Sequence, residues 1–430
     1  MSGALFALHS RTFASLRKHR NYRLFFIGQV VSVSGTWMQN LALAWYVVEL
    51  THSPVAVGLL AFCRFLPFSV FGLAAGVIAD RFDNRRLVMA TQAAAMTLST
   101  LLAVLALTGT AELWHVYLLA ALLGSTLVFD APGRHALTFR MVGRDELPNA
   151  VALNASLFNA SRILGPSVAG VLIAVTSVGV AFAINAVSFL AVLTALFLMR
   201  EDELFPVERP EQPPTLIRGV GEAFAYVRRS RRVLTVLAIT FVVSTVGVNF
   251  HVLVPVLAAE TLHAGSVTFG FLSATFGAGA LVGALATASL GRASLKGLLL
   301  GTGGFGVALL ALAPLHAFAP AAALLFVTGV CFTLWTANSQ AILQLSSPDH
   351  LRGRILSLYL LAFAGSAPIG GLLAGWLADV GGTELAFAVA GAASLAMTAV
   401  AIAFRPVQVR VRAASIAAAA ARADEDQLAA

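Results

Sequence analysis

Hydrophobic residues run in long blocks along this chain, and short polar segments separate one block from the next. Residues 54–79 and 87–108, for example, hold a single charged side chain between them, Arg64. About 20 apolar residues in a helix cross a bilayer core, so each block can span a membrane. The pattern predicts an all-α membrane protein with twelve transmembrane helices. We expect them at residues 22–50, 54–79, 87–108, from 113, after a polar loop at 141–148, then at 178–199, 233–259, 268–290, 295–315, 319–345, 354–378 and 385–404.

A hydrophilic segment divides these helices into two sets of six, and the two halves are weakly similar. Asp145-Glu-Leu147 precedes the fifth helix as Asp349-His-Leu351 precedes the eleventh. Pro166 has a counterpart in Pro368, at nearly the same offset. This internal repeat predicts two pseudo-symmetric six-helix bundles.

Composition supports a membrane protein, and the placement of the charges gives its orientation. The chain is 59% hydrophobic and 11% charged, with a net charge of +8, whereas soluble domains are about a quarter charged. Of the 28 Lys and Arg side chains, all but Arg64 and Arg162 lie in the termini, the central segment and alternate loops, or at the boundaries of those segments. Basic residues in short loops stay on the cytoplasmic side, so both termini are predicted to be cytoplasmic. Such a distribution argues against a nucleic-acid partner.

The segments outside the spans complete the expected domain organisation. The central segment also contains Leu216, Val220, Phe224 and Val227 at helical spacing, which predicts an amphipathic helix at the membrane surface. We expect a cytoplasmic N-terminal segment at 1–22, an N-terminal bundle at 23–199, a cytoplasmic linker at 200–232, a C-terminal bundle at 233–404 and a cytoplasmic tail at 405–430.

Residues 76–86 form a short polar hairpin between the second and third predicted helices. They read Gly-Val-Ile-Ala-Asp-Arg-Phe-Asp-Asn-Arg-Arg, so one segment holds two acids and three arginines. This pattern resembles the Gly-x-x-x-Asp-Arg signature of major facilitator superfamily transporters, although Asp83 replaces a usual glycine and Asn84 a usual basic residue. The residues that fit the signature are Gly76, Asp80, Arg81, Arg85 and Arg86.

Asp80 is the candidate gate residue of this hairpin. Its carboxylate could accept backbone N–H groups at the start of the eleventh helix, near Arg354, and pair with Arg85 or Arg134. Those contacts would hold the cytoplasmic side closed. The alternative is an acid in a solvated loop, whose exposed ion pairs contribute about 0 to 1 kcal/mol.

The fifth predicted helix carries a second motif. Gly165, Pro166 and Gly170 resemble the Gly-Pro-x-x-Gly-Gly motif in the fifth helix of drug and metabolite antiporters, with Ala169 in place of a glycine. Proline removes a helix hydrogen bond and small residues let a neighbouring helix approach. The motif therefore predicts either a functional bend or a packing kink.

Polar side chains inside the spans are candidates for the substrate cavity, because hydrocarbon offers them no partners. Hydrogen bonding between helices is the alternative role for each. Arg64 and Arg162 both lie near mid-bilayer, where they would favour an anionic solute or else hold helices together. The cavity candidates are Trp37, Gln39, Asn40, Arg64, Asn154, Asn159 and Arg162.

Four titratable residues are candidates for the coupling proton or the gate. Asp130 and Arg134 are four residues apart and share one helix face, near the cytoplasmic end of the fourth helix. That position favours membership of the Asp80 gate network over proton carriage. Glu49 and His251 are weaker candidates for the proton.

Within the major facilitator superfamily, three stretches resemble the branch of the enterobactin exporter and macrolide efflux proteins. They are Phe129–Arg134, Asn154–Gly170 and Glu222–Arg228. The resemblance implies a monomeric transporter in the bacterial inner membrane that exports a siderophore-like or drug-like molecule by proton antiport and alternating access. A proton-coupled importer is the alternative within the class. No metal, cofactor or enzymatic motif is found, which argues against a membrane enzyme or receptor.

Overall fold

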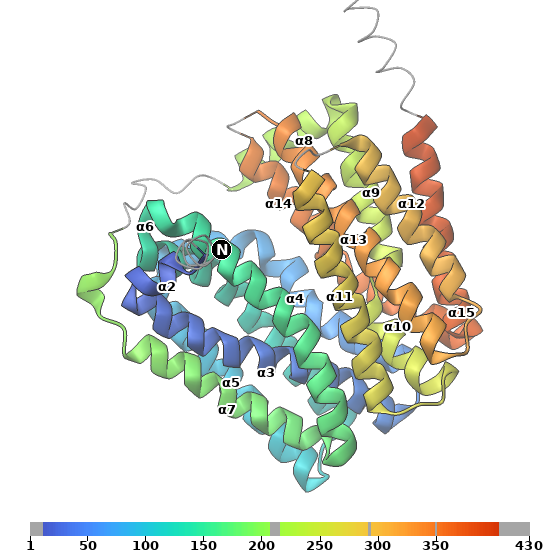
Figure 1. Cartoon of the computed structure of the whole chain (residues 1–430), viewed down its shortest axis with the longest axis horizontal. Coiled ribbons are helices and arrows are strands. Elements are labelled where there is room, and N and C mark those ends of the chain that lie inside the picture. The colour runs from blue at the N-terminus through green and yellow to red at the C-terminus, as the bar shows by residue number, and fades with distance from the viewer. Residues whose placement is uncertain (1–11, 207–215, 291–293, 349–350, 404–430) are drawn as a thin grey trace, which may run out of the picture.

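The computed structural model describes residues 12–206, 216–290, 294–348 and 351–403, and these residues are helical with short connections (Figure 1). The first half contains α2 (Ala14–Lys18), α3 (Arg20–Thr51), α4 (Pro54–Arg81), α5 (Asn84–Thr108), α6 (Leu113–Val175), α7 (Val178–Phe197) and the 3-10 turn η1 (Glu201–Glu203). The second half contains α8 (Leu216–Arg229), α9 (Arg231–Gly247), α10 (Phe250–Val256), the π-helical η2 (Leu257–Thr261), α11 (Ser266–Leu290), α12 (Leu295–Leu312), α13 (Phe318–Ser346), α14 (Arg352–Phe363) and α15 (Ala367–Ala403).

The predicted all-α membrane fold is confirmed. Nine helical segments of the described chain are long and apolar enough to cross a membrane. Two of them hold two spans each, because Gly143 within α6 and Gly382 within α15 have φ of 70° and 68° and interrupt the helix. Glycine adopts such a φ without steric cost. Together with the 32-residue α3, they provide the twelve spans.

Three connections differ from the sequence prediction. The loop expected at 141–148 is wrong, since only Gly143 departs from helical geometry there. The seventh span is divided into α9 and α10 at residues 248–249, and the eleventh into α14 and α15 at residues 364–366. A uniform apolar pattern carries no signal for such breaks.

The helices form two bundles that meet along two seams. In the first bundle α3 packs on α6 and α7, and in the second α13 packs on α11 and α12. Between the bundles, α4 packs on α15 and α6 packs on α11. Glycines allow these crossings: a Cβ on Gly58 would lie 2.6 Å from the Gly371 carbonyl oxygen, and one on Gly170 would lie 2.6 Å from the Ser266 carbonyl oxygen.

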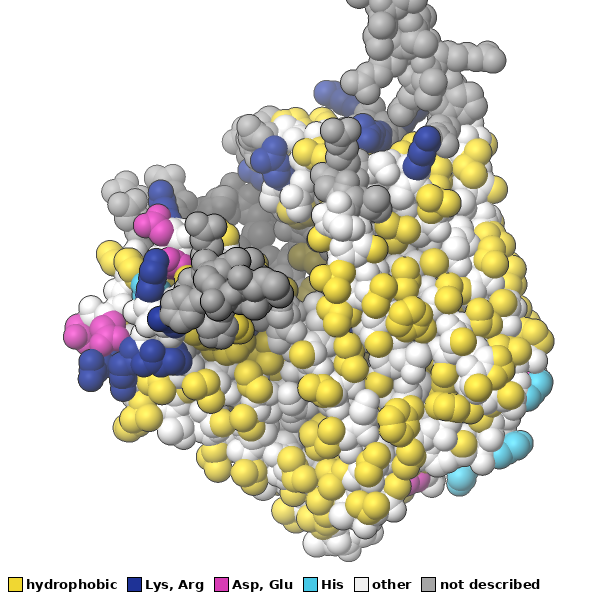
Figure 2. All heavy atoms as spheres, in the orientation of Figure 1, with side chains coloured by type: hydrophobic (Ala, Val, Ile, Leu, Met, Phe, Trp, Pro, Cys, Tyr) yellow, Lys and Arg dark blue, Asp and Glu magenta, His cyan; other side chains and the backbone are white. Residues whose placement is uncertain are grey.

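The two ends of the molecule differ. We call the end with α2, Gly143 and α8 the linker end, and the end with Thr51, Glu112 and Glu260 the far end. Figure 2 shows hydrophobic side chains over the flank, Lys and Arg gathered at the linker end, and a hollow between the bundles there. The glycine contacts of both seams lie toward the far end, so the bundles diverge toward the linker end (Figure 1).

Helix α8 follows the linker and packs on the second bundle. Ala223 and Val227 are buried, and the Tyr226 hydroxyl donates to the Ser346 carbonyl oxygen at 2.6 Å. Phe224, expected on the same apolar face as Val227, is instead 51% exposed. The side chains of Leu216 and Val220 lie outside the described residues.

The close approach of α4 and α6 gives a test of the packing. A Cβ on Gly124 would lie 2.0 Å from the Arg64 carbonyl oxygen, whereas nothing lies within 4 Å of one on Gly221 in α8. Gly124→Ala should destabilise the protein by about 1 to 3 kcal/mol through overpacking. Gly221→Ala should leave the melting temperature unchanged or raise it, because alanine is the better helix former. Thermal unfolding of both variants in detergent checks the packing, and equal melting temperatures would contradict it.

Candidate functional site

Asp130 is the centre of a buried polar cluster inside the first bundle. It is 3% exposed, and one carboxylate oxygen accepts from the Thr91 hydroxyl and the Gln92 amide, both at 2.9 Å. The other oxygen accepts from Nε of Arg134 at 2.8 Å and from its Nη2. Arg134 also donates to Gln29 on α3. The carboxylate is therefore fully partnered by α5 and α6.

Sequence analysis assigned Asp130 and Arg134 to candidate roles but missed their partners. Gln29, Thr91 and Gln92 are polar residues within spans, and Gln29 and Gln92 are 3% and 5% exposed. Polar residues at that depth are the signal that could have identified them. Their contacts make Asp130 a residue that joins helices within one bundle.

The hairpin at 76–86 is anchored to the first bundle by several side chains. Asp83 caps α5 by accepting from the Arg86 backbone N–H at 3.1 Å, and Arg140 donates to it at 2.9 Å. Burial raises the pKa of Asp83, but the Arg86 amide and the Arg140 guanidinium lower it by more, so this pKa lies below its usual range. Asp83 takes the place of the usual glycine and gives the hairpin an anchor of its own.

The other residues of the gate motif are placed as follows. Arg85 donates to the Leu196 carbonyl oxygen at 2.8 Å and pairs with Glu201, while Arg81 and Arg86 are exposed. Gly76 and Asp80 lie near the end of α4, and their side-chain environment lies outside the described residues. The two arginines expected beside Asp80 both have other partners here, Arg85 with Glu201 and Arg134 with Asp130. The gate role of Asp80 stays a prediction.

Arg64 lies in the first bundle and faces the broken seventh span. Its Nη2 donates to the Asn40 side-chain oxygen at 2.5 Å, and its guanidinium lies 5.6 Å from the Phe65 ring centre. The Phe65 ring meets the His251 ring edge to face at 5.0 Å. Nε2 of His251 is buried without a hydrogen-bond partner. The contact across the two bundles is thus made by Phe65, which lies beside both the Arg64 guanidinium and the His251 ring.

Arg162 lies on α6 and contacts aromatic rings of the second bundle. Its guanidinium lies 5.0 Å from the ring centre of Phe276 on α11 and 5.8 Å from that of Phe332 on α13. These distances are typical of cation–π contacts. Nη2 of Arg162 is buried and has no acceptor. Phe250, one residue before His251, packs on Phe276 with ring centres 4.3 Å apart.

The rings beside Arg162 belong to a larger aromatic cluster in the second bundle. Phe276, Phe305, Trp335 and Phe363 each lie within 6.4 Å of Phe332, ring centre to ring centre. No ion pair to Arg64 or Arg162 is found among the described residues, and the buried acid Asp130 is paired with Arg134. Arg64 and Arg162 thus each lie beside aromatic rings, and neither has a carboxylate partner among the described residues.

The remaining cavity candidates mostly bond within the first bundle. Gln39 accepts from the Asn185 amide at 2.7 Å and is 5% exposed, so it joins α3 to α7. Asn154 accepts from the Tyr22 hydroxyl at 3.1 Å. Asn159 donates to the carbonyl oxygen of Ala155 in its own helix. Hydrogen bonding between or within helices, the alternative role, describes these three contacts.

The fifth-helix motif lies in a part of α6 whose backbone keeps helical φ/ψ, since the only non-helical residue of α6 among those described is Gly143. A Cβ on Gly165 would lie 2.6 Å from the Trp37 Cβ, and Trp37 packs on Phe158 with ring centres 5.4 Å apart. Pro166 is buried beside Gly165. The glycines of this motif allow close packing on both α3 and α11.

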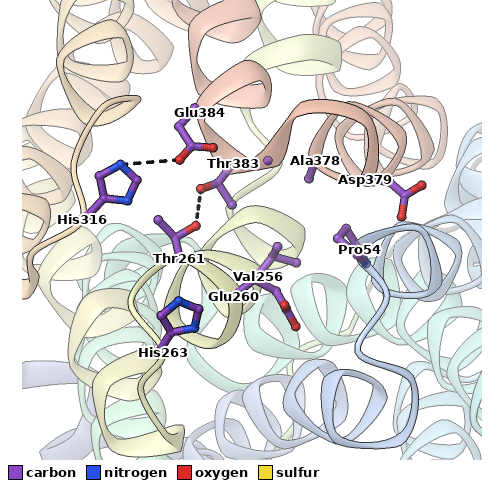
Figure 3. Close-up of a pocket in the computed structure, with 11 residues that line it drawn as sticks. Pro54, Val256, Glu260, Thr261, His263, His316, Ala378, Asp379, Thr383 and Glu384 are labelled. Carbon is purple, nitrogen blue, oxygen red and sulfur yellow. Dashed lines mark hydrogen bonds and ion pairs between the residues drawn. The ribbon is translucent and has the colours of Figure 1, made fainter.

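A polar pocket of about 480 Å³ opens at the far end, lined by Pro54 of the first bundle and by residues of the second bundle (Figure 3). In Figure 3, Glu384 lies beside His316 and Thr261 beside Thr383, at 3.6 and 2.7 Å. No group of three or more His, Cys, Asp or Glu in the described chain is placed to hold a metal ion. Glu49, the far-end proton candidate, accepts from the Trp45 indole at 2.6 Å.

Comparison with protein families matches residues 10–430 to the family described as transmembrane secretion effector. The staphyloferrin A transporter of Staphylococcus aureus is 25% identical over 380 residues, covering 87% of this chain and 93% of that protein. Macrolide efflux protein A of Streptococcus pyogenes is 23% identical over 385 residues, covering 87% of this chain and 95% of that protein. An enterobactin exporter of Escherichia coli is 24% identical over 366 residues, 84% and 86% of the two chains.

Solved structures show the same fold at low sequence identity. The nucleoside transporter NupG (D323A mutant) superposes with a TM-score of 0.73 at 12% identity, covering 90% of this chain and 99% of its own. The peptide transporter POT in complex with sulfate gives 0.74 at 14% identity, covering 90% and 94%. The architecture is that of major facilitator superfamily transporters.

The Asp130 cluster leads to a stability prediction. Asp130→Asn removes the charge that Arg134 faces and should cost about 3 kcal/mol, at the low end for a buried pair because the Arg134 side chain is 24% exposed. Replacing both residues, Asp130→Asn with Arg134→Gln, should recover part of that loss. Melting temperatures of the single and double variants measure the coupling. A single variant as stable as the unaltered protein would show that the pair does not hold the bundle together.

Proposed function

Since the chain belongs to the transmembrane secretion effector family of major facilitator transporters, and is therefore a transporter and not an enzyme, we propose that it exports a small anionic molecule. The relatives named above carry siderophores and macrolides by their descriptions, so the proposed cargo is siderophore-like or drug-like. Export would proceed by alternating access across the bacterial inner membrane, in exchange for protons.

The observation that carries the proposal is the pair Arg64 and Arg162 between the bundles. Each cation in a bilayer needs a partner or water, and neither has a carboxylate partner among the described residues. A guanidinium offers planar, paired donors to a carboxylate or similar anion. The neighbouring rings of Phe276 and Phe332 suit an apolar or aromatic part of the same molecule.

The membrane potential acts in one direction on such a cargo. A cell interior at negative potential repels an anion, and each charge that leaves gains about 2.3 kcal/mol per 100 mV. Protons that enter in exchange carry positive charge inward, which is electrically equivalent to the outward movement of an anion. The membrane potential acting on the anion favours export over the alternative of proton-coupled import, whereas the inward proton gradient can drive either process.

The proposed orientation puts both termini and the 200–232 linker in the cytoplasm. Lys and Arg gather at the linker end (Figure 2), which supports that orientation. In intact cells, an impermeant thiol reagent should label Thr110→Cys, at the far end, and should not label Glu203→Cys, in the linker. Both positions are exposed, so accessibility depends on the side of the membrane. The opposite labelling pattern would reverse the topology.

Substitution of Arg162 by lysine tests anion recognition, because it keeps the charge and loses the planar fork. In everted membrane vesicles, Arg162→Lys should weaken the transport of anionic compounds about 10- to 100-fold, the loss expected for one charged hydrogen bond. Neutral compounds of similar size should be affected little.

A matched control is Arg228→Lys, because Arg228 is exposed on α8 and away from the cavity. It should transport like the unaltered protein. Equal losses for anionic and neutral compounds in Arg162→Lys would assign the arginine to holding helices together and would remove the basis for an anionic cargo.

A further inference from the structure

Arg162 belongs to the first bundle, but its guanidinium packs on side chains of the second bundle. It projects from α6, while the rings that it faces, Phe276 and Phe332, belong to α11 and α13. The contact therefore crosses the seam between the bundles. Nη2 of Arg162 is buried and has no acceptor, so the guanidinium keeps an unused donor in this arrangement.

The contact lies at one edge of the seam between α6 and α11. Toward the far end, Gly170 packs on Gly270 and accepts the Ser266 hydroxyl at 3.0 Å through its carbonyl oxygen. Toward the linker end, a Cβ on Gly277 would lie 3.1 Å from the Ile163 side chain and 3.3 Å from the Arg162 carbonyl oxygen. Arg162 lies on the linker-end side of the Gly170 contact and is partly exposed.

We propose that Arg162 is an anion-sensitive latch: its stacking on Phe276 and Phe332 keeps the far end closed, and an aromatic carboxylate that binds the guanidinium releases it. The choice of ligand rests on the proposed function, whereas the latch itself does not. The two rings would contact the apolar part of the ligand, and the guanidinium would bind the carboxylate of the ligand. Arg162 acts here as a positioning residue for the conformational change.

The physical basis is competition for one cation. A ring face attracts a cation through its quadrupole and repels an anion. A carboxylate that approaches the stacked guanidinium can accept a hydrogen bond from the free Nη2. Its interaction with the guanidinium becomes more favourable when the guanidinium moves away from the two ring faces, because those faces repel the anion. The ligand would then bind more tightly to the state in which the seam is loosened, and this differential affinity shifts the population toward it.

Ser266 provides a reporter that does not depend on transport. Its side chain is 4% exposed and lies across the seam from Gly170, so a cysteine there should react slowly while the far end is closed. The assay uses Ser266→Cys in a background with Cys63→Ala and Cys331→Ala. The protein is embedded in lipid nanodiscs, where the thiol reagent reaches both faces, and the labelling rate is followed.

Removing the charge of Arg162 should open the seam without any ligand. Arg162→Met should raise the labelling rate about 5- to 30-fold, the range of a desolvated cation–π contact, and Arg162→Lys should raise it less. Arg228→Met is the matched control, since Arg228 is exposed on α8 and lies outside the seam between α6 and α11. Unchanged labelling in Arg162→Met, or an equal rise in Arg228→Met, would overturn the latch.

The anion response is tested with benzoate and its neutral isostere benzamide. Benzoate at millimolar concentration should raise the labelling of Ser266→Cys when Arg162 is present and should have no effect in Arg162→Met. Benzamide should have no effect in either protein. Equal effects of the two compounds, or none from benzoate, would overturn the assignment of an aromatic carboxylate. Labelling measures the conformation alone and does not require transport. A failure of the proposed anion export and a failure of the proposed latch can therefore be told apart.

Discussion

A bilayer gives a charged side chain no partner, and this constraint explains the arrangement of charge in the protein. Translocon scales put the cost of an arginine at mid-membrane at about 2.5 to 3.5 kcal/mol. Arg134 offsets this cost inside one bundle by pairing with Asp130, whose carboxylate also accepts hydrogen bonds from Thr91 and Gln92. Arg64 offsets this cost through Asn40 and Phe65 of its own bundle, and Arg162 through Phe276 and Phe332 of the other bundle. Arg134 is thus neutralised by a carboxylate of its own bundle, whereas Arg64 and Arg162 have no carboxylate partner among the described residues.

The glycine contacts decide which end of the space between the bundles is open. Gly58 on α4 packs against the Gly371 carbonyl on α15, and Gly170 on α6 packs against Gly270 on α11. Backbones at such distances are held by van der Waals contact over long helices, which membrane helices use in place of the hydrophobic effect. Both contacts lie toward the far end, so the hollow faces the linker end (Figure 2). In the proposed orientation this is a conformation that receives cargo from the cytoplasm.

The sequence predicted the fold well because uncharged blocks of bilayer length can hardly be anything but spanning helices. It misplaced the loop at 141–148 because a single glycine, Gly143, makes that turn, and it missed the breaks at residues 248–249 and 364–366 because local apolar composition is the same on both sides. Arg64 and Arg162 could be named because a charge within a span stands out. Their neighbours Phe276 and Phe332 could not, since a phenylalanine in an apolar block carries no sign of the cation that packs on it from the other bundle.

The central claim is that the cargo is an anion exported in exchange for protons, and the charge moved per transport event tests it most directly. Proteoliposomes of known orientation, adsorbed to a solid-supported membrane, give a transient current when a transported compound is added at the cytoplasmic face. The account predicts a current equivalent to positive charge entering the cytoplasmic side, which is reduced in Arg162→Lys. No current, or a current of the opposite sign, would contradict it.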